Sequence, residues 1–160
     1  MSITVLTIPV TEWARMHPEM FFRDGKATAR NIVEQLVDGA RVLGAPSVED
    51  VSFKEWWIVA AQEDWFPNAR FPLPPDFRFG EIIVFPEQGQ NCTRPEFVVA
   101  AFARDVIVMG AKGDPVILGT VSSTDEIHCF LARTKSWRRV IAFRGIRLEP
   151  PHEQPTSSSD

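Results

Sequence analysis

The polar side chains that could do chemistry lie in two stretches of the first half of the chain. One stretch, ARNIVEQLVDGARVLG at 29–44, places amide and acidic side chains at helical spacing on one face. In the other stretch, Gln62, Glu63 and Asp64 directly follow a run of apolar residues. Carboxylates can transfer protons, whereas amides can only donate and accept hydrogen bonds. We expect a site where the loop that begins at Gln62 faces the polar side of the helix.

A metal site is the second chemical candidate, because Asp125, Glu126 and His128 lie close together in the sequence. We expect a strand over 126–133, which puts Glu126 and His128 on one face and Asp125 on the other. Ordinary surface residues of a hairpin are therefore the favoured interpretation. No Ser-His-Asp signature is present, and we expect no metal and no cofactor.

The helix that must position the first stretch is the clearest element of the sequence. Apolar residues recur at i, i+3, i+4 and i+7 from Ala29 to Leu43, which predicts an amphipathic helix. Thr28 is its expected N-cap, and Gly44 its expected left-handed C-terminal residue. The face expected to pack on a sheet consists of Ile32, Val33, Leu36, Val37 and Ala40.

The remaining elements are a second main helix, a short helix and several strands. Pro95 suits a first helical position, and 96–104 continues that helix. The short helix is expected over 10–16. The expected strands cover 3–8, 47–53, 56–61, 106–110, 115–122, 126–133 and 138–144. Helices on one face of a mostly antiparallel sheet form a two-layer α+β sandwich, so we expect a single domain over 1–148 and a disordered tail over 149–160.

Three motifs in the first half occur in an order that is typical of a known family. A turn reads HPEMFFR at 17–23, the helix reads QLVDG at 35–39, and the strand leads into QEDWF at 62–66. This order resembles the ATPase domain of the DNA gyrase B subunit, a member of the GHKL family that includes histidine kinases and mismatch-repair ATPases. There an Arg-Pro-Gly-Met-Tyr-Ile-Gly turn precedes a helix with Glu-x-x-Asp-Asn, and a strand enters an Asp-x-Gly-x-Gly loop. The resemblance covers about 13–118 and implies the GHKL (Bergerat) fold.

The departures from the family pattern imply that hydrolysis is lost. Gln35 stands where the family's Glu polarises the attacking water, and Glu34 points about 100° away on a helix. Gly39 replaces the Asn that holds Mg²⁺, and Gln62 replaces the Asp that reads adenine. The segment at 89–94, in place of the glycine-rich lid, has one glycine. The resemblance therefore implies a pseudo-ATPase with a vestigial nucleotide pocket made of Gln35, Asp38, Gly39, Gln62 and Asp64.

Aromatic residues supply a second candidate site, a surface for a partner protein. The chain has five Trp, twelve Phe and no Tyr, and several of them lie in the long loop at 62–80. Four prolines keep this loop out of a sheet. The loop either folds back over the sheet and buries its aromatic side chains or presents them to a partner. The candidate partner surface consists of Trp57, Trp65, Phe66, Arg70 and Arg78.

Composition limits the classes of function. The net charge of −4 disfavours nucleic-acid binding by phosphate neutralisation, and no stretch is apolar enough to span a membrane. Cys92 and Cys129 match no metal spacing, which predicts free thiols in the cytoplasm. Two hypotheses follow. The first is a non-enzymatic protein-binding module on a degenerate GHKL-like fold, such as a bacterial inhibitor or immunity protein. The second is a nucleotide-binding protein that retains a partial adenine pocket.

Overall fold

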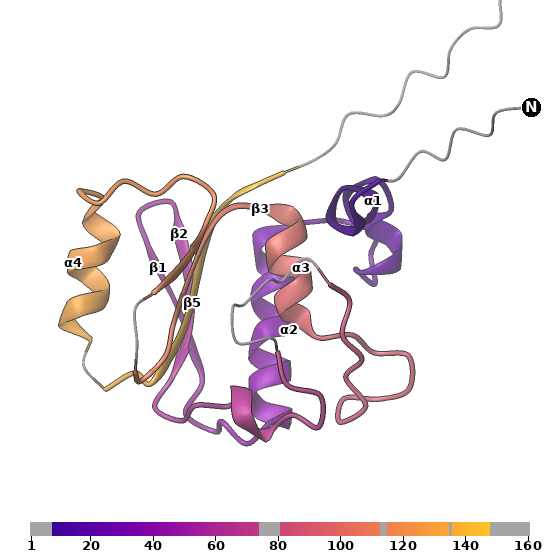
Figure 1. The fold of residues 1–160 in the computed structure, drawn as a ribbon, viewed down its shortest axis with the longest axis horizontal. Helices are drawn as coiled ribbons and strands as arrows, with labels where there is room; N and C mark the ends of the chain where they lie inside the picture. Colours follow the sequence, from indigo (N-terminus) through magenta and orange to yellow (C-terminus); the bar gives the residue numbers. More distant parts are fainter. Residues whose placement is uncertain (1–7, 74–80, 113–114, 135, 148–160) are drawn as a thin grey trace, which may run out of the picture.

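One antiparallel sheet with helices on both faces forms the fold (Figure 1). The structure, a computed structural model, describes residues 8–73, 81–112, 115–134 and 136–147. The helices are α1 (Val10–Met16), α2 (Ala29–Val42), α3 (Pro95–Phe102) and α4 (Glu126–Arg133). The strands are β1 (Glu49–Phe53), β2 (Trp56–Ala61), β3 (Ala103–Met109), β4 (Val116–Leu118) and β5 (Arg139–Ile146). Single 3-10 turns cover Pro18–Met20 and Phe66–Asn68.

The five strands lie in the order β1-β2-β5-β3-β4, and every neighbouring pair is antiparallel. The last strand, β5, therefore lies at the centre of the sheet. It pairs with β2 through Val59 opposite Ile141 and with β3 through Asp105 opposite Arg144. This placement joins the two halves of the chain into one sheet, so the α+β class expected from the sequence is confirmed.

Helix α2 forms as its sequence predicts. The Thr28 side chain accepts a hydrogen bond from the backbone N–H of Asn31 at 3.1 Å, which caps the first turn. At the other end Gly44 has φ +84°, a left-handed conformation that glycine adopts without a Cβ clash. The buried side chains of the helix include the five residues expected to face the sheet, Ile32, Val33, Leu36, Val37 and Ala40.

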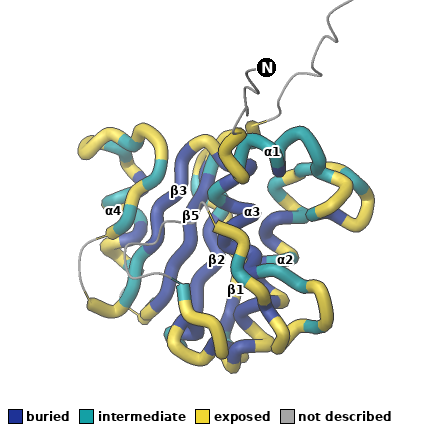
Figure 2. The backbone as a smooth tube through the Cα atoms, turned by 45° about the vertical axis from the view of Figure 1, so that its right-hand side comes forward, coloured by how far each residue is buried: buried dark blue, intermediate teal, exposed yellow. Residues whose placement is uncertain are grey.

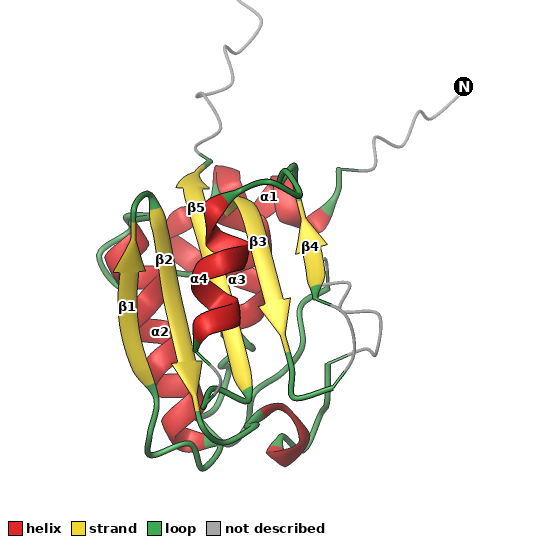
Figure 3. Cartoon of the chain, turned by 90° about the vertical axis from the view of Figure 1, so that its left-hand side faces the viewer, coloured by secondary structure: helices red, strands yellow, loops and turns green. Residues whose placement is uncertain are grey.

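The two faces of the sheet support two apolar clusters. The larger cluster includes residues of α2 and α3, and the smaller one includes residues of α4. Figure 3 shows α4 on one face of the sheet and α2 with α3 on the other, and Figure 2 shows the buried backbone of the strands between them. Trp56 belongs to the smaller cluster, whereas its neighbour Trp57 packs against the larger one. Successive side chains of a strand point to opposite faces, which accounts for this division.

The strand expected over 126–133 is wrong, because these residues form α4. Asp125 is the N-cap, and its side chain accepts a hydrogen bond from the backbone N–H of Ile127 at 3.0 Å. Ile127 and Leu131 are buried one turn apart, and Phe130 packs beside them. This i, i+3, i+4 spacing belongs to a helix rather than a strand, so α4 covers the face of the sheet opposite α2.

The other boundaries differ from the predictions by a few residues. The expected helix over 96–104 ends at Phe102, and β3 begins at Ala103. The short helix α1 has the expected bounds, with Pro9 rather than Thr11 at its N-cap. The strand predicted over 3–8 lies almost entirely outside the described residues. The tail predicted over 149–160 lies wholly outside them.

Candidate functional site

A hollow lies beside α2 and the start of α3, and we call it the helix cleft. Its volume is about 650 Å³. Four segments contribute to its wall: the turn before α2, the polar face of α2, the loop before α3 and the first turn of α3. The lining residues are Met20, Phe21, Phe22, Arg23, Asp24, Asn31, Glu34, Gln35, Asp38, Gln88, Asn91, Cys92, Thr93, Pro95 and Val98.

The polar side of α2 supplies Asn31, Glu34, Gln35 and Asp38 to the cleft. Their i, i+3, i+4 and i+7 spacing puts them along one stripe of the helix. Glu34 and Gln35 both line the cleft, although adjacent side chains point about 100° apart around a helix. Glu34 and Asp38 are exposed, whereas Gln35 is half-buried.

The Gln35 amide holds the wall of the cleft together. Its Nε2 donates a hydrogen bond of 2.7 Å to the backbone carbonyl oxygen of Phe21, which ties the turn before α2 to the helix. A second tie is made by Asn31, whose Nδ2 donates to Asp24 Oδ1 at 2.9 Å and to the Lys26 carbonyl oxygen at 2.9 Å. The hydrogen bond from the backbone N–H of Lys26, together with that from Asn31, holds the pKa of Asp24 below its ordinary value.

The charge that lines the cleft is negative. Its lining contains three carboxylates, those of Asp24, Glu34 and Asp38, and one guanidinium, that of Arg23, so the sum is −2. Glu34 shares Arg30 with Asp50, at 3.7 Å and 3.1 Å from the guanidinium respectively. Asp38 makes no ion pair or side-chain hydrogen bond with the residues that the structure describes, and its charge is available to a ligand.

Only two residues of the predicted nucleotide pocket, Gln35 and Asp38, line the cleft. Gly39 lies beneath Pro95, and a Cβ at this position would lie 3.0 Å from Pro95 Cγ and 3.5 Å from Phe85 Cε1. The glycine therefore permits close packing of α2 against the start of α3. This packing explains why a residue without a side chain stands at position 39.

Gln62 and Asp64 do not line the cleft. The backbone N–H of Gln62 donates to Ser47 Oγ at 2.9 Å, and its side chain is exposed. Asp64 accepts two hydrogen bonds of 2.9 Å from the guanidinium of Arg139. The five residues predicted to form one pocket are therefore divided among four environments.

The predicted partner surface is corrected in part. Trp65 and Phe66 are 1% and 6% exposed, so these two side chains belong to the core rather than to a surface. Phe66 lies beneath two guanidinium groups, with Arg139 Cζ 3.9 Å and Arg94 Cζ 5.7 Å from its ring centroid. The loop folds back here, as the first of the two interpretations expected.

The other three members of that surface have different environments. Trp57 is half-buried, and Arg70 is exposed, with its guanidinium 5.6 Å from the exposed Phe71 ring. Arg78 lies outside the described residues. No continuous aromatic surface follows from these positions.

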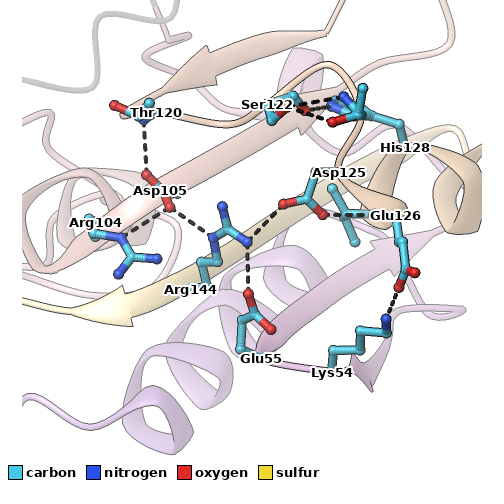
Figure 4. Close-up of polar contacts among 12 residues, drawn as sticks. Lys54, Glu55, Arg104, Asp105, Thr120, Ser122, Asp125, Glu126, His128 and Arg144 are labelled. Atoms are coloured by element: carbon cyan, nitrogen blue, oxygen red, sulfur yellow. Dashed lines mark hydrogen bonds and ion pairs between the residues drawn. The ribbon is translucent and has the colours of Figure 1, made fainter.

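The candidate metal residues lie at the start of α4. Asp125 caps the helix, Glu126 pairs with Lys54, and the His128 ring is 3.0 Å from the carbonyl oxygen of Ser122 (Figure 4). Each group thus has a separate partner. Among the described residues, no group of three or more His, Cys, Asp or Glu side chains is arranged to hold a metal ion. Within the same part of the chain, no helix is both long and apolar enough to cross a membrane.

The loop before α3 also lines the cleft, although none of its residues is among the five predicted to form the nucleotide pocket; the resemblance aligns 89–94 only with the family's lid. Gln88, Asn91, Cys92 and Thr93 line the cleft. The loop is anchored by a hydrogen bond of 2.8 Å from the backbone N–H of Phe85 to the Cys92 carbonyl oxygen. Its composition of amides and hydroxyls was the available signal, but its position depends on tertiary contacts.

Comparison of the chain with protein-family models, curated proteins and solved structures finds no significant match.

Proposed function

We propose that this protein is a non-enzymatic binding module that holds a basic segment of a partner protein in the helix cleft. The observation that carries the proposal is the Asp38 carboxylate, which has no ion-pair partner among the described residues and lies in a lining whose summed charge is −2. A lysine or arginine side chain of a partner is the complementary group. Such a contact lies at the surface and has a modest free energy, so several contacts must act together.

The apolar part of the cleft supports the same kind of ligand. Met20 is 64% exposed at its edge, and Pro95 and Val98 contribute apolar wall on the α3 side. Lysine and arginine have long aliphatic stems that pack on apolar surface while the charged head reaches an acid. Methionine adapts its shape to different partners. An apolar wall beside a carboxylate thus fits the stem and the head of one basic side chain.

The scaffold of the module, in this proposal, is a degenerate GHKL-like fold. Its support is the order of elements: a turn, the helix α2, the hairpin of β1 and β2, a long connection, the helix α3 and the hairpin of β3 and β4. The motifs that resemble the family occur in this order over about 13–118.

The alternative, a nucleotide-binding protein with a partial adenine pocket, has one observation in its favour. Gln35 and Asp38 both lie in the cleft, and an amide and a carboxylate can hydrogen-bond a purine edge. Against it, the negative lining would repel a triphosphate. In addition, Gln35 Nε2 already donates to the Phe21 carbonyl oxygen. The protein-binding function is therefore the better supported of the two.

Within this proposal we assign the module to inhibitors or immunity proteins of bacterial type, on the basis of its net charge of −4. Such a protein captures one partner and needs no turnover. We assign it to the cytoplasm, since Cys92 and Cys129 are both free thiols.

The test is titration calorimetry with a tetralysine peptide at low ionic strength. We expect binding to the natural sequence, and a rise in Kd of about fivefold, equivalent to ~1 kcal/mol, for the double variant Glu34→Gln/Asp38→Asn. The matched control is Glu81→Gln, which removes an exposed carboxylate that does not line the cleft. Equal affinities for the cleft variant and the control would contradict the proposal.

The natural partner can be found with the same site. We expect a protein from the source cell to be retained by the natural chain and not by Asp38→Lys, whose charge at the cleft is reversed. If the natural chain and Asp38→Lys retained the same proteins and bound tetralysine with equal affinity, the cleft would have no role in binding.

A further inference from the structure

A second polar cluster lies at the end of the sheet where β3 begins and where β4 and β5 end. Asp105 at its centre has a fully buried carboxylate that accepts three hydrogen bonds (Figure 4). The donors are Arg144 Nε at 2.8 Å, the backbone N–H of Thr120 at 3.0 Å and Arg104 Nε at 3.1 Å. These three bonds satisfy the carboxylate, which therefore fixes two guanidinium groups in place.

Arg144 is occupied by other protein groups. Its Nη1 donates to Glu55 and to Asp125, each at 2.8 Å, and its guanidinium carbon lies 4.5 Å from the Trp56 ring centroid. A side chain held by three carboxylates and a ring is a structural anchor rather than a ligand-binding group.

Arg104, unlike Arg144, has guanidinium N–H groups that could bind a ligand. Only its Nε is bonded, the side chain is 60% exposed, and its two Nη groups have no partner among the residues that the structure describes. Arg147 is exposed, and its guanidinium also lacks a partner in the described part of the chain. Its backbone N–H donates to the Phe102 carbonyl oxygen, which positions the residue.

These two arginines line one hollow of about 520 Å³, which we call the arginine hollow. Two glycines shape it. A Cβ at Gly119, where φ is +85°, would lie 2.3 Å from the Arg104 carbonyl oxygen. A Cβ at Gly145, where φ is +69°, would lie 3.0 Å from Arg104 Cβ. The glycines thus let two strand ends close around Arg104. The full lining is Arg104, Asp105, Gly119, Thr120, Arg144, Gly145, Ile146 and Arg147.

We propose that the arginine hollow binds a small, doubly charged oxyanion of the phosphate class. Its lining contains three guanidinium groups and one carboxylate, a sum of +2. The guanidinium edges of Arg104 and Arg147, which have no partner among the described residues, supply forked N–H donors that match tetrahedral oxyanions. Glu55 and Asp125, which contact Arg144, reduce the local positive potential, so we expect a Kd on the order of 1 mM. The site is separate from the helix cleft and does not depend on its function.

The test is a titration of the whole chain with inorganic phosphate, followed by NMR of the backbone amides. We expect saturable shifts at Thr120, Gly145 and Arg147, and none of that size at Asn31 or Asp38 in the helix cleft. Arg147→Gln should raise the phosphate Kd about tenfold, since it removes charge-assisted hydrogen bonds. The double variant Arg104→Gln/Arg147→Gln should abolish saturation.

The matched control is Arg133→Gln, an exposed arginine in the last turn of α4 that does not line the hollow. We expect its phosphate Kd to equal that of the natural chain. Arg147→Gln removes no side-chain hydrogen bond or ion pair with the described residues, so it tests the site even if the double variant fails to fold. Phosphate binding that survives Arg147→Gln with unchanged Kd would overturn the proposal, as would acetate that binds as tightly as phosphate.

Discussion

At the scale of single residues, Arg94 and Glu96 form an ion pair that is almost fully withdrawn from solvent. Their side chains are 1% and 2% exposed, and two hydrogen bonds of 3.0 and 2.8 Å join them. Arg94 Nη1 is buried and has no hydrogen-bond partner among the described residues. The rings of Phe66 and Phe85 lie 5.7 and 5.5 Å from the guanidinium carbon. Desolvation of both charges offsets much of their attraction, so the pair contributes less than its geometry suggests.

Removal of one partner should therefore cost more than removal of both. We expect Glu96→Leu to lower the free energy of unfolding by about 3–5 kcal/mol, because it leaves the Arg94 charge buried and uncompensated. The double variant Arg94→Met/Glu96→Leu should recover most of that loss. Urea unfolding measures both values, and the exposed pair of Arg30 and Glu34 provides a control whose disruption should cost less than about 1 kcal/mol. A double variant less stable than the single one would contradict this interpretation.

Asp105 should make stability depend on pH in acid. Burial raises its pKa, but the hydrogen bonds from Arg144, Thr120 and Arg104 outweigh burial and hold the pKa below its ordinary value of 3.8. The folded state then binds this proton less tightly than the unfolded state. The ionised Asp105 carboxylate therefore contributes to the free energy of unfolding. This contribution is complete above pH 3.8 and is lost as the pH falls through the lower, folded-state pKa. We expect Asp105→Asn to flatten the dependence of the urea midpoint on pH below about pH 4. An unchanged slope would show that Asp105 is not linked to acid unfolding.

Residue roles could be predicted from the sequence where neighbours in the chain determine them. Thr28 and Gly44 bound α2 as expected, because a cap depends on the backbone of its own turn. Asp64 could not be assigned, since its partner Arg139 lies 75 positions away. Gly39 is explained by the Pro95 ring rather than by a lost metal ligand, which no local pattern indicates.

At the scale of elements, α4 shows how a local pattern can be misread. The stretch from Glu126 to Arg133 was predicted as a strand, although Asp125 was available as an N-cap and Ile127, Phe130 and Leu131 have helical spacing. The helix is short, and short apolar runs suit either state. The helix also explains how the second face of the sheet is covered, because its buried side chains contact Trp56, Ile58 and Ala142 within one cluster.

Two substitutions in α4 separate the helix from a strand. In a strand, positions 127 and 129 share a face, whereas in this helix Ile127 is fully buried and Cys129 is exposed. We expect Ile127→Ala to lower the free energy of unfolding by about 2–4 kcal/mol through a cavity. We expect Cys129→Ala to change it by less than about 0.5 kcal/mol. If both substitutions lowered the free energy of unfolding by similar amounts, measured by thermal or urea unfolding, the result would favour a strand.

At the scale of the whole molecule, the class of fold was predictable and the strand order was not. The alternation of apolar strands with two amphipathic helices implied helices packed on a sheet. The central position of β5, paired with β2 and β3, depends on contacts between segments that lie far apart in the sequence. The helix cleft has the same origin, because its walls come from segments around Phe21, Gln35 and Thr93 that pack together only in the folded chain.

The whole cleft, rather than any one residue, leads us to expect that the protein neither hydrolyses ATP nor binds it tightly. Gln35 cannot act as a base, a metal-binding side chain at Gly39 would meet Pro95, and the lining has a summed charge of −2. Restoring one group, as in Gln35→Glu, should therefore not restore turnover. Residual binding of the adenine ring should be weak and insensitive to Mg²⁺, since ring contacts need no metal.

Calorimetry with ATP, with and without Mg²⁺, measures this expectation. Adenosine is the matched probe, because it lacks the phosphates that could bind in the arginine hollow. For ATP itself, the Arg104→Gln/Arg147→Gln variant prevents binding of its phosphates in that hollow. We expect Kd values above about 1 mM for adenosine and for ATP with this variant, and no phosphate release. A Mg²⁺-dependent Kd in the micromolar range in this variant would contradict the expectation. Phosphate release that is abolished by Glu34→Ala would identify Glu34, which lines the cleft one residue before Gln35, as a base and make the protein an ATPase.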